Sequence, residues 1–294
     1  AAAAANIFYS LSTMATTSLE DIAAASNGPK LFQIYIFRDR GLSSEFVERA
    51  KAAHYDALAL TVDTPVAGNR ERDRRTGMTM PPRFGPASLL SFAMRPEWLI
   101  NFLRSPDFQL ANVAHRVDAL ADGAMGIIQY VNNQFDPSAT WEDAAWLARE
   151  WGGRFIIKGV QSVEDAMRAK DVGATGIMIS NHGGRQLDDV PAPIELLRSI
   201  RDAVGPDMEL IVDGGVRRGS DVVKALCMGA NACSIGRPYL YGLAAGGQDG
   251  VASVLSIFRS EMERTMTLLG RTDIASLNAG ALSSIMGVQA EGET

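Results

Sequence analysis

The sequence predicts an α/β fold of the (β/α)8 barrel type, in which parallel strands alternate with helices. Short apolar runs rich in strand-forming residues alternate with helical patterns of about 10 to 15 residues, as in βα units. The strand runs are almost continuously hydrophobic, which is typical of strands buried on both faces. Glycine-rich loops follow the last two strands, and no G-x-G-x-x-G pattern follows an early one. A barrel is therefore favoured over a doubly wound open sheet.

Seven strands are expected along the chain, each followed by a helix or a longer excursion. They are placed at Ile7–Thr13, Leu31–Ile36, Ala57–Asp63, Phe155–Gly159, Gly176–His182, Glu209–Gly215 and Cys233–Arg237. Polar residues gather at the C-terminal ends of these runs. Because the carboxyl ends of parallel strands meet on one face of a barrel, we expect the functional site there.

The helix signals agree with this order of elements. Ser43 and Ser162 are expected N-cap residues, and Pro193 suits the first turn of a helix. The last long helix is expected from about Gln248 to Leu269, with an apolar stripe on one face and Gly270 at its end.

One region, residues 64–139, lacks clean βα units and carries scattered prolines and aromatics. A loop of this length is either functional or disordered. Since it follows a strand end, we expect an excursion over the active face of a single domain spanning residues 1–294. Within it, Leu89–Leu103 suits a membrane surface or a partner, although packing against its own domain is the preferred interpretation.

The composition excludes several classes of protein. Among 294 residues, 28 Lys and Arg stand against 34 Asp and Glu, so the chain lacks the basic surplus expected of a nucleic-acid partner. Cys227 and Cys233 show no metal-ligand spacing, so no metal site is expected and a reducing compartment fits. No apolar run approaches the roughly 18 residues of a membrane span, and no signal-peptide pattern opens the chain. We expect a cytoplasmic protein, with peripheral contact at the inner face of a membrane as an option.

Two glycine-rich loops predict a phosphate site. The segments "VDGGVRRGSD" and "SIGRPYLYG" end the last two strands and place glycines and arginines where a helix begins. Backbone N–H groups and a helix N-terminus can both face an anion there. The expected phosphate ligands are Gly214, Gly215, Arg217, Gly236 and Arg237. A tight turn explains any one of these glycines alone, but two such loops at successive strand ends favour phosphate.

The chemistry is concentrated in "SNHGGRQLD", Ser180 to Asp188. His182 follows an apolar strand and precedes two glycines that allow close approach of a ligand. Arg185 lies three residues further on, an arrangement suited to a base beside a carboxylate clamp. His54 and His115 lie on a polar helix face and in the excursion, and are interpreted as incidental.

These motifs, together with "TVDTPVAGNRERD", "FQIYIFRDR" and "IIKGV", closely resemble the FMN-dependent 2-hydroxy acid dehydrogenase/oxidase family from about Ile7 to Leu282. The segment "NNQFDPSATWED" most resembles the L-lactate dehydrogenase branch, with glycolate oxidase and mandelate dehydrogenase as relatives. The resemblance implies a TIM barrel, FMN, and oxidation of a small L-2-hydroxy acid, L-lactate first, to the 2-oxo acid. It also implies a homo-oligomer, and leaves oxygen, a quinone or a cytochrome as the electron acceptor.

The resemblance implies roles for five residues of the catalytic site. His182 would remove a proton from the 2-hydroxy acid while a hydride equivalent reaches flavin N5. Asp63 would stabilise the imidazolium that forms. Arg185 would bind the substrate carboxylate through its planar fork, helped by Arg70 and Tyr35.

Cofactor contacts are implied in the same way. Lys158 would lie near flavin N1 and stabilise the negative charge of the reduced ring. The other implied cofactor contacts are Ser12, Gln33, Thr61, Ser180 and Asp213. Without the resemblance, a role as mere partners of backbone groups stays open for Gln33 and Thr61 as the less favoured alternative.

The chain departs from the family pattern at its beginning. An earlier helical segment with a substrate-binding tyrosine, and the first barrel strand, are not visible. The expected fold is thus a (β/α)8 barrel that lacks its N-terminal segment and first strand. Two alternatives to the enzyme stay open: a non-catalytic or truncated flavin-binding remnant, and another phosphate-binding TIM-barrel enzyme.

Overall fold

A computed structural model describes residues 1–66, 68–79, 82–104, 110–116, 130–131 and 133–282. In this part of the chain, one sheet of seven parallel strands follows the chain order. The strands are β1 (Tyr9–Ser12), β2 (Lys30–Ile34), β3 (Ala57–Thr61), β4 (Arg154–Val160), β5 (Gly176–Ser180), β6 (Glu209–Asp213) and β7 (Ala232–Ser234). All seven predicted strands are confirmed.

Six of the strands end earlier than the sequence predicts, and the residues beyond them turn away from the sheet. His182 and Gly214, both predicted as strand, have φ angles of 55° and 122°, which no extended strand accommodates. The predicted strand ends are therefore loops, and these loops carry most of the candidate site.

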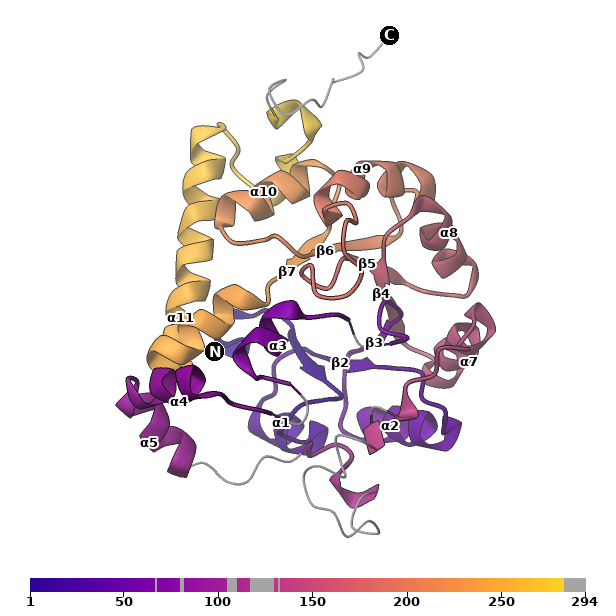
Figure 1. Ribbon diagram of the computed structural model, residues 1–294. Coiled ribbons are helices and arrows are strands. Elements are labelled where there is room, and N and C mark those ends of the chain that lie inside the picture. Colours follow the sequence, from indigo (N-terminus) through magenta and orange to yellow (C-terminus); the bar gives the residue numbers. More distant parts are fainter. Residues whose placement is uncertain (67, 80–81, 105–109, 117–129, 132, 283–294) are drawn as a thin grey trace.

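The sheet curls into a half-barrel with helices on its outer side (Figure 1). These helices are α1 (Leu19–Ala25), α2 (Arg40–Ala52), α7 (Trp141–Trp151), α8 (Val163–Asp171), α9 (Pro193–Val204), α10 (Gly219–Cys227) and α11 (Arg237–Leu268). β1 and β7 are the two edge strands of the sheet in the described residues. The predicted barrel-type α/β fold is confirmed, in this open form.

Alternation along the strands separates two apolar layers. Outward side chains such as Phe32, Leu58 and Ile157 are fully buried in the main core beneath the helices. Inward side chains form a separate, smaller cluster made of Leu31, Ala57, Ala59, Ile156 and Met178. Because side chains point alternately to the two faces, the next inward position of each strand lies at its C-terminal end.

Two of the three predicted helix starts are confirmed. Ser162 caps α8, its hydroxyl accepting from a backbone N–H of the first turn, and Pro193 is the first residue of α9. The prediction for Ser43 is wrong, because α2 begins one turn earlier, after the N-cap Asp39. Ser43 is instead buried within the helix, where its hydroxyl accepts from the N–H of Phe37.

The last helix begins earlier than predicted. α11 starts at Arg237 and joins two helical stretches across a kink at Gly246 and Gly247, so the expected helix from Gln248 is only its second part. Phe258 of the expected apolar stripe is buried against the main core. The helix ends before Gly270, which has the left-handed φ of 67° that suits a helix terminus.

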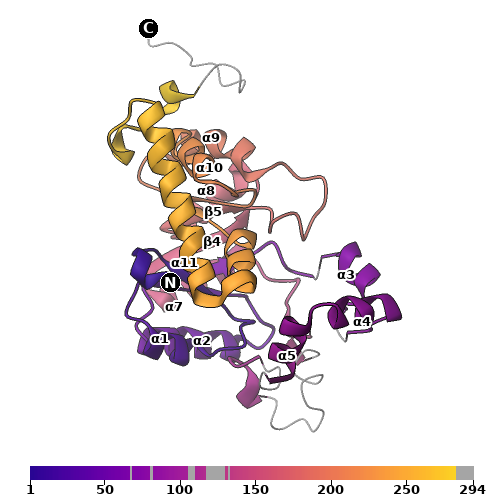
Figure 2. The same cartoon turned by 90° about the vertical axis from the view of Figure 1, so that its left-hand side faces the viewer.

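The excursion between β3 and α7 contains short helices, α3 (Glu71–Thr76), α4 (Pro86–Ala93) and α5 (Pro96–Arg104). Figure 2 shows these three helices standing away from the sheet. The preferred interpretation that Leu89–Leu103 packs against its own domain is wrong: Leu90, Met94 and Leu103 are 62%, 66% and 73% exposed. The physical reason is that α4 and α5 pack on each other through an aromatic ladder of Phe84, Phe92, Trp98 and Phe102.

Candidate active site

The ends of six strands place polar side chains in one layer, which we call the polar belt. It consists of Ser12, Gln33, Thr61, Lys158, Ser180 and Asp213. Lys158 and Ser180 each follow, by two positions, a residue of the inward apolar cluster. The ladder pairs Thr61 with Lys158 and Ser180 with Asp213, so these side chains are neighbours. Strand register thus brings together six predicted cofactor contacts.

Polar contacts connect the belt residues into two groups. The Ser12 hydroxyl donates to Gln33 Oε1 at 3.1 Å, and Gln33 Nε2 donates to Thr61 Oγ1 at 2.9 Å. In the other group, the Ser180 hydroxyl donates to the Asp213 carboxylate at 2.7 Å. Lys158 Nζ lies 3.7 Å from the same carboxylate. The belt therefore offers a mostly buried polar surface with a held cation at its centre.

His182 and Asp63 form a pair beside this belt. Nδ1 of His182 lies 3.0 and 3.2 Å from the two carboxylate oxygens of Asp63. The Asp63 side chain is only 4% exposed, whereas the His182 side chain is 24% exposed. His182 adopts a left-handed φ of 55°, and its N–H donates to the Ser180 hydroxyl at 3.0 Å. A non-glycine residue held in that conformation is a common feature of functional sites.

The pair is arranged so that its carboxylate stays charged. Burial raises the pKa of the Asp63 carboxyl, but the hydrogen bond from His182 and the charge of Lys158 outweigh it, and the net pKa is below the usual value. An ionised Asp63 fixes the proton of the imidazole on Nδ1. Nε2 is then the nitrogen able to accept a proton.

Gly159 provides the space that Asp63 occupies. A Cβ on Gly159 would lie 2.7 Å from Asp63 Cβ and 2.8 Å from its Cγ. Gly159 has a φ of 100° and lies where the β4–β5 register shifts. Only a glycine fits both the conformation and the contact. Gly159 lies within the motif "IIKGV", but no role for it could be predicted, because a contact with a residue distant in the chain leaves no local signal.

The guanidinium groups of Arg70 and Arg237 lie close enough to that of Arg185 for their charges to interact. Partial burial lowers the pKa of Arg185, and the like charges of Arg70 and Arg237 lower it further. Nε of Arg70 is buried and has no hydrogen-bond partner among the described residues. Burial and then the charge of Asp63 raise the pKa of Tyr35 to about 12, so its hydroxyl stays protonated. The unpartnered Nε of Arg70 beside a neutral hydroxyl suits an anionic ligand with a polar group.

The two glycine-rich loops lie at the neighbouring ends of β6 and β7. The predicted phosphate ligands there are Gly214, Gly215, Arg217, Gly236 and Arg237. A Cβ on Gly215 or Gly236 would meet nothing within 4 Å, so open space lies beside both. Arg237 begins α11 and donates to the carbonyl of Gly183 at 2.6 Å, which ties this loop to the histidine loop. Arg217 is exposed just before α10.

Comparison with known proteins identifies the family. The profile described as "FMN-dependent dehydrogenase" matches residues 1–284. The chain belongs to the FMN-dependent dehydrogenase family. It is 42% identical to a "Putative L-lactate dehydrogenase" of Mycobacterium tuberculosis over 95% of the chain, and 41% identical to an "L-lactate oxidase" of Nostoc over 96%. A solved structure of the monotopic membrane protein (S)-mandelate dehydrogenase superposes with a TM-score of 0.90 at 37% identity.

The matches cover only part of each relative. The chain spans 66% of the Mycobacterium tuberculosis protein, 73% of the Nostoc protein and 75% of the mandelate dehydrogenase chain, and in that structure 96% of this chain is matched. The family predicted from the sequence is confirmed, and FMN is the cofactor of that family.

The residues of this chain fit the cofactor of the family. A flavin ring presents hydrogen-bonding atoms along one edge, and the polar belt supplies hydroxyls, an amide and the Lys158 ammonium in one layer. The open space beside Gly215 and Gly236, with Arg237 and the start of α11, suits a single phosphate. The belt would hold the flavin ring, and the two glycine-rich loops after β6 and β7 would hold the phosphate.

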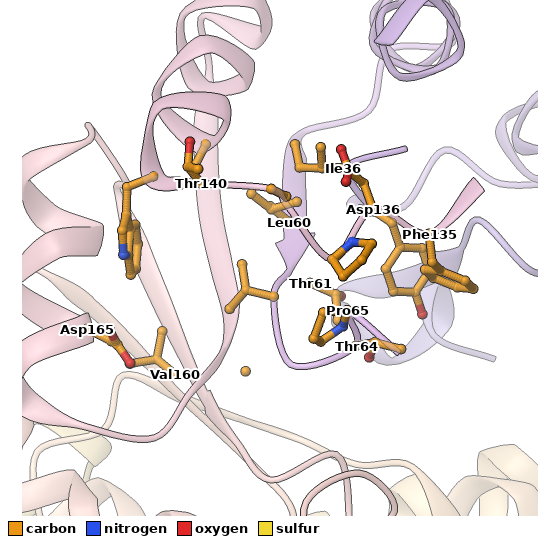
Figure 3. Close-up of a pocket in the computed structure, with 17 residues that line it drawn as sticks. Ile36, Leu60, Thr61, Thr64, Pro65, Phe135, Asp136, Thr140, Val160 and Asp165 are labelled. Carbon is orange, nitrogen blue, oxygen red and sulfur yellow. The ribbon is translucent and has the colours of Figure 1, made fainter. Parts of the chain in front are cut away.

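A cavity of about 260 Å³ adjoins the site from the side of the helices. Figure 3 shows it between the ends of β2 to β4 and the segment leading into α7, with Leu60, Pro65, Phe135 and Val160 on its walls. Of the predicted site residues, Tyr35 and Thr61 line it. Leu60 belongs to the outward core, so this cavity lies behind the belt and is not the space over it.

Proposed function

We propose that this FMN-dependent dehydrogenase oxidises a small L-2-hydroxy acid to the 2-oxo acid, with L-lactate as the first candidate. The observation that carries the proposal is the His182–Asp63 pair beside the converging guanidiniums of Arg70 and Arg185. Such a site matches a substrate with a carboxylate next to a carbon that bears a hydroxyl. The names of the relatives, L-lactate dehydrogenase and L-lactate oxidase, support the same substrate class.

The arginines orient the substrate. Arg185 binds the carboxylate through its planar fork, and the unpaired Nε of Arg70 provides a further donor. The protonated Tyr35 hydroxyl helps to hold the same end of the substrate. Fixing the carboxylate in this way directs the neighbouring hydroxyl toward His182.

His182 moves the proton. Nε2 accepts the hydroxyl proton, and the buried Asp63 carboxylate stabilises the imidazolium that results. The polar belt and the two glycine-rich loops would hold FMN, which would supply the acceptor for a hydride from the substrate carbon. Lys158 holds a positive charge within the belt and would stabilise the negative charge of a reduced flavin held there.

The alternative of another phosphate-binding TIM-barrel enzyme, one that would use a catalytic cysteine, gains no support from the two cysteines of the described residues. Cys227 is buried in α10. Burial raises the pKa of the Cys233 thiol in β7 to about 12, so it does not supply a thiolate. The flavin-binding remnant is distinguished from the enzyme by experiment.

The test is anaerobic mixing of the FMN-loaded protein with L-lactate, D-lactate, glycolate and L-mandelate while flavin absorbance is followed. We expect bleaching by an L-2-hydroxy acid. His182→Gln should retain FMN and lose about 10²- to 10⁴-fold in the rate of bleaching, the usual contribution of a general base. Bound flavin that no 2-hydroxy acid bleaches would support the remnant, and bleaching of His182→Gln at the parent rate would remove the base from the mechanism.

We further propose that α4 and α5 bind the surface of an anionic lipid bilayer. Among the described residues no helix is both long and apolar enough to cross a membrane. Nevertheless Leu90, Met94 and Leu103 present exposed apolar side chains on this helix pair, next to the exposed Arg95 and Arg104. Apolar burial with flanking cations is the chemistry of interfacial helices. The (S)-mandelate dehydrogenase neighbour is described as a monotopic membrane protein, which supports the same proposal.

Co-sedimentation with vesicles tests the bilayer proposal. The protein should bind vesicles that contain anionic lipid more strongly than neutral ones, and Leu103→Glu should abolish binding. Leu268→Glu is the matched control, because Leu268 is 82% exposed on α11, away from this pair. Vesicle binding by Leu103→Glu at the parent level would contradict the proposal. It would also be contradicted if the parent bound no vesicles and instead formed an oligomer that Leu103→Glu disrupts.

A further inference from the structure

We propose that Gln186 is a positioning residue that fixes the loop bearing Asp63 and Arg70 to the loop bearing His182 and Arg185. The inference rests on the proposed function, because it concerns how the two halves of that substrate site are held together. The two loops follow β3 and β5, and His182 and Asp63 are 119 residues apart in the chain.

All the hydrogen-bonding groups of the Gln186 amide are directed at the loop after β3. Its Nε2 donates to the carbonyl of Asp63 and to the carbonyl of Val66, both at 3.0 Å. Its Oε1 accepts from the N–H of Gly68 at 3.1 Å. One side chain therefore holds three backbone positions, at residues that belong to no strand or helix in the described stretches 62–66 and 68–70.

The two loops touch closely at Gly68. A Cβ on Gly68 would lie 2.7 Å from Gln186 Oε1 and 2.9 Å from Gln186 Cα, and would also collide with the carbonyl of Arg185. From Gly68 the connection continues to the substrate site, because the N–H of Arg70 donates to the Gly68 carbonyl at 3.1 Å. Gln186 thus reaches Arg70 through one glycine.

The hydrogen bonds of Gln186 should matter more for the position of Arg70 than for that of Asp63. Asp63 is also held by its packing on Gly159 and its contact with His182, so it has support apart from Gln186. Among the described residues, the guanidinium Nε of Arg70 has no partner. Its backbone is held by Gly68 and by the first turn of α3, a helix that stands away from the sheet. Loss of Gln186 should therefore misplace Arg70 relative to Arg185 more than it disturbs the proton acceptor.

The expected signature is a split between affinity and rate. Gln186→Leu keeps side-chain size but removes all three hydrogen bonds to the loop. The KM for L-lactate and the Kd of oxalate should then rise about tenfold, the effect of about one weakened hydrogen bond between Arg70 and the bound carboxylate. The rate of flavin bleaching at saturation should change less than the KM. Gln186→Glu keeps an acceptor for Gly68 but cannot donate to Asp63 and Val66, and should show the same direction.

A double-mutant cycle separates positioning from a general structural role. If Gln186 acts through Arg70, Gln186→Leu should add no further loss of oxalate affinity to Arg70→Ala. Gln134→Leu is the matched control, because Gln134 also bonds the backbone of a distant residue, Asp39, but lies outside the site. It should leave the oxalate Kd unchanged.

Three results would overturn this role for Gln186. The first is an oxalate Kd equal to that of the parent in both Gln186 variants. The second is that Gln186→Leu and Arg70→Ala lose oxalate affinity additively. The third is that Gln134→Leu raises the oxalate Kd as much as Gln186→Leu does. Oxalate binding, followed by the flavin absorbance shift, needs no turnover. If the parent protein oxidises no 2-hydroxy acid, the proposed function fails, and the oxalate measurements still decide the role of Gln186.

Discussion

Replacing Gly159 by alanine tests how the proton acceptor is held. The added methyl would lie 2.7 Å from Asp63 Cβ, 2.8 Å from its Cγ and 2.9 Å from its backbone nitrogen, all closer than carbon or nitrogen atoms normally approach. Asp63 cannot stay in place, and its 3.0 Å contact with His182 Nδ1 should be lost. The imidazole then loses the carboxylate that fixes its tautomer and stabilises its charged form.

The structure separates two effects of this substitution. Alanine at a φ of 100° strains the backbone, which costs about 1–3 kcal/mol of stability. Gly173 has a similar φ of 91°, but a Cβ there would meet nothing within 4 Å. Gly173→Ala should therefore share the backbone cost without the collision. Displacement of Asp63 should lower the rate of proton abstraction in Gly159→Ala alone, by about 10²- to 10⁴-fold.

The assay is anaerobic bleaching of the flavin by L-lactate, with thermal unfolding measured in parallel. We expect both alanine variants to unfold at lower temperature than the parent, and Gly159→Ala alone to lose rate. Equal bleaching rates in Gly159→Ala and Gly173→Ala would refute the reasoning, because the collision with Asp63 would then have no chemical consequence.

Three further outcomes are expected. Arg237→Glu should weaken FMN binding about 10- to 100-fold through lost pairing with the phosphate, measured by flavin titration of the apoprotein. Arg185→Lys keeps the charge but loses the planar fork, so steady-state assays should show a higher KM and a lower kcat for L-lactate. Because the pKa of Asp63 is held below its usual value, its contribution to stability is present above about pH 4 and is lost as the pH falls through the lowered pKa. Asp63→Asn should flatten that acid part of the unfolding profile.

The sequence was sufficient for the strands and the belt because both follow from local patterns. Buried parallel strands read as apolar runs, and the polar residue at the end of each run marks the point where the inward face meets the site. Thr61 and Lys158 are typical cases, since the ladder pairs them side by side. Strand register is fixed by the same apolar pattern, and it aligns these polar strand ends side by side.

Contacts between segments distant in the chain could not be predicted from local patterns. Gln186 and Gly159 both lay inside quoted motifs, but their partners are on a loop that is distant in the chain, and no spacing reveals such a contact. Ser43 matched the composition of an N-cap, yet tertiary packing placed it inside α2. The exposure of α4 and α5 was also missed, because an apolar segment has the same sequence whether or not anything covers it.

The origin of the polar belt limits where this chain can change its length. Each belt residue faces inward because an even number of positions separates it from the inward apolar residue before it, as Lys158 is separated from Ile156. Deleting one residue within β3 would turn Thr61 toward the helices and Leu60 toward the flavin site, and would reverse every side chain beyond the deletion. Such a deletion should be more damaging than any single substitution in the belt. Insertions should instead be tolerated at turns on the opposite end of the strands, such as the one at Gly173, where there is room around the backbone.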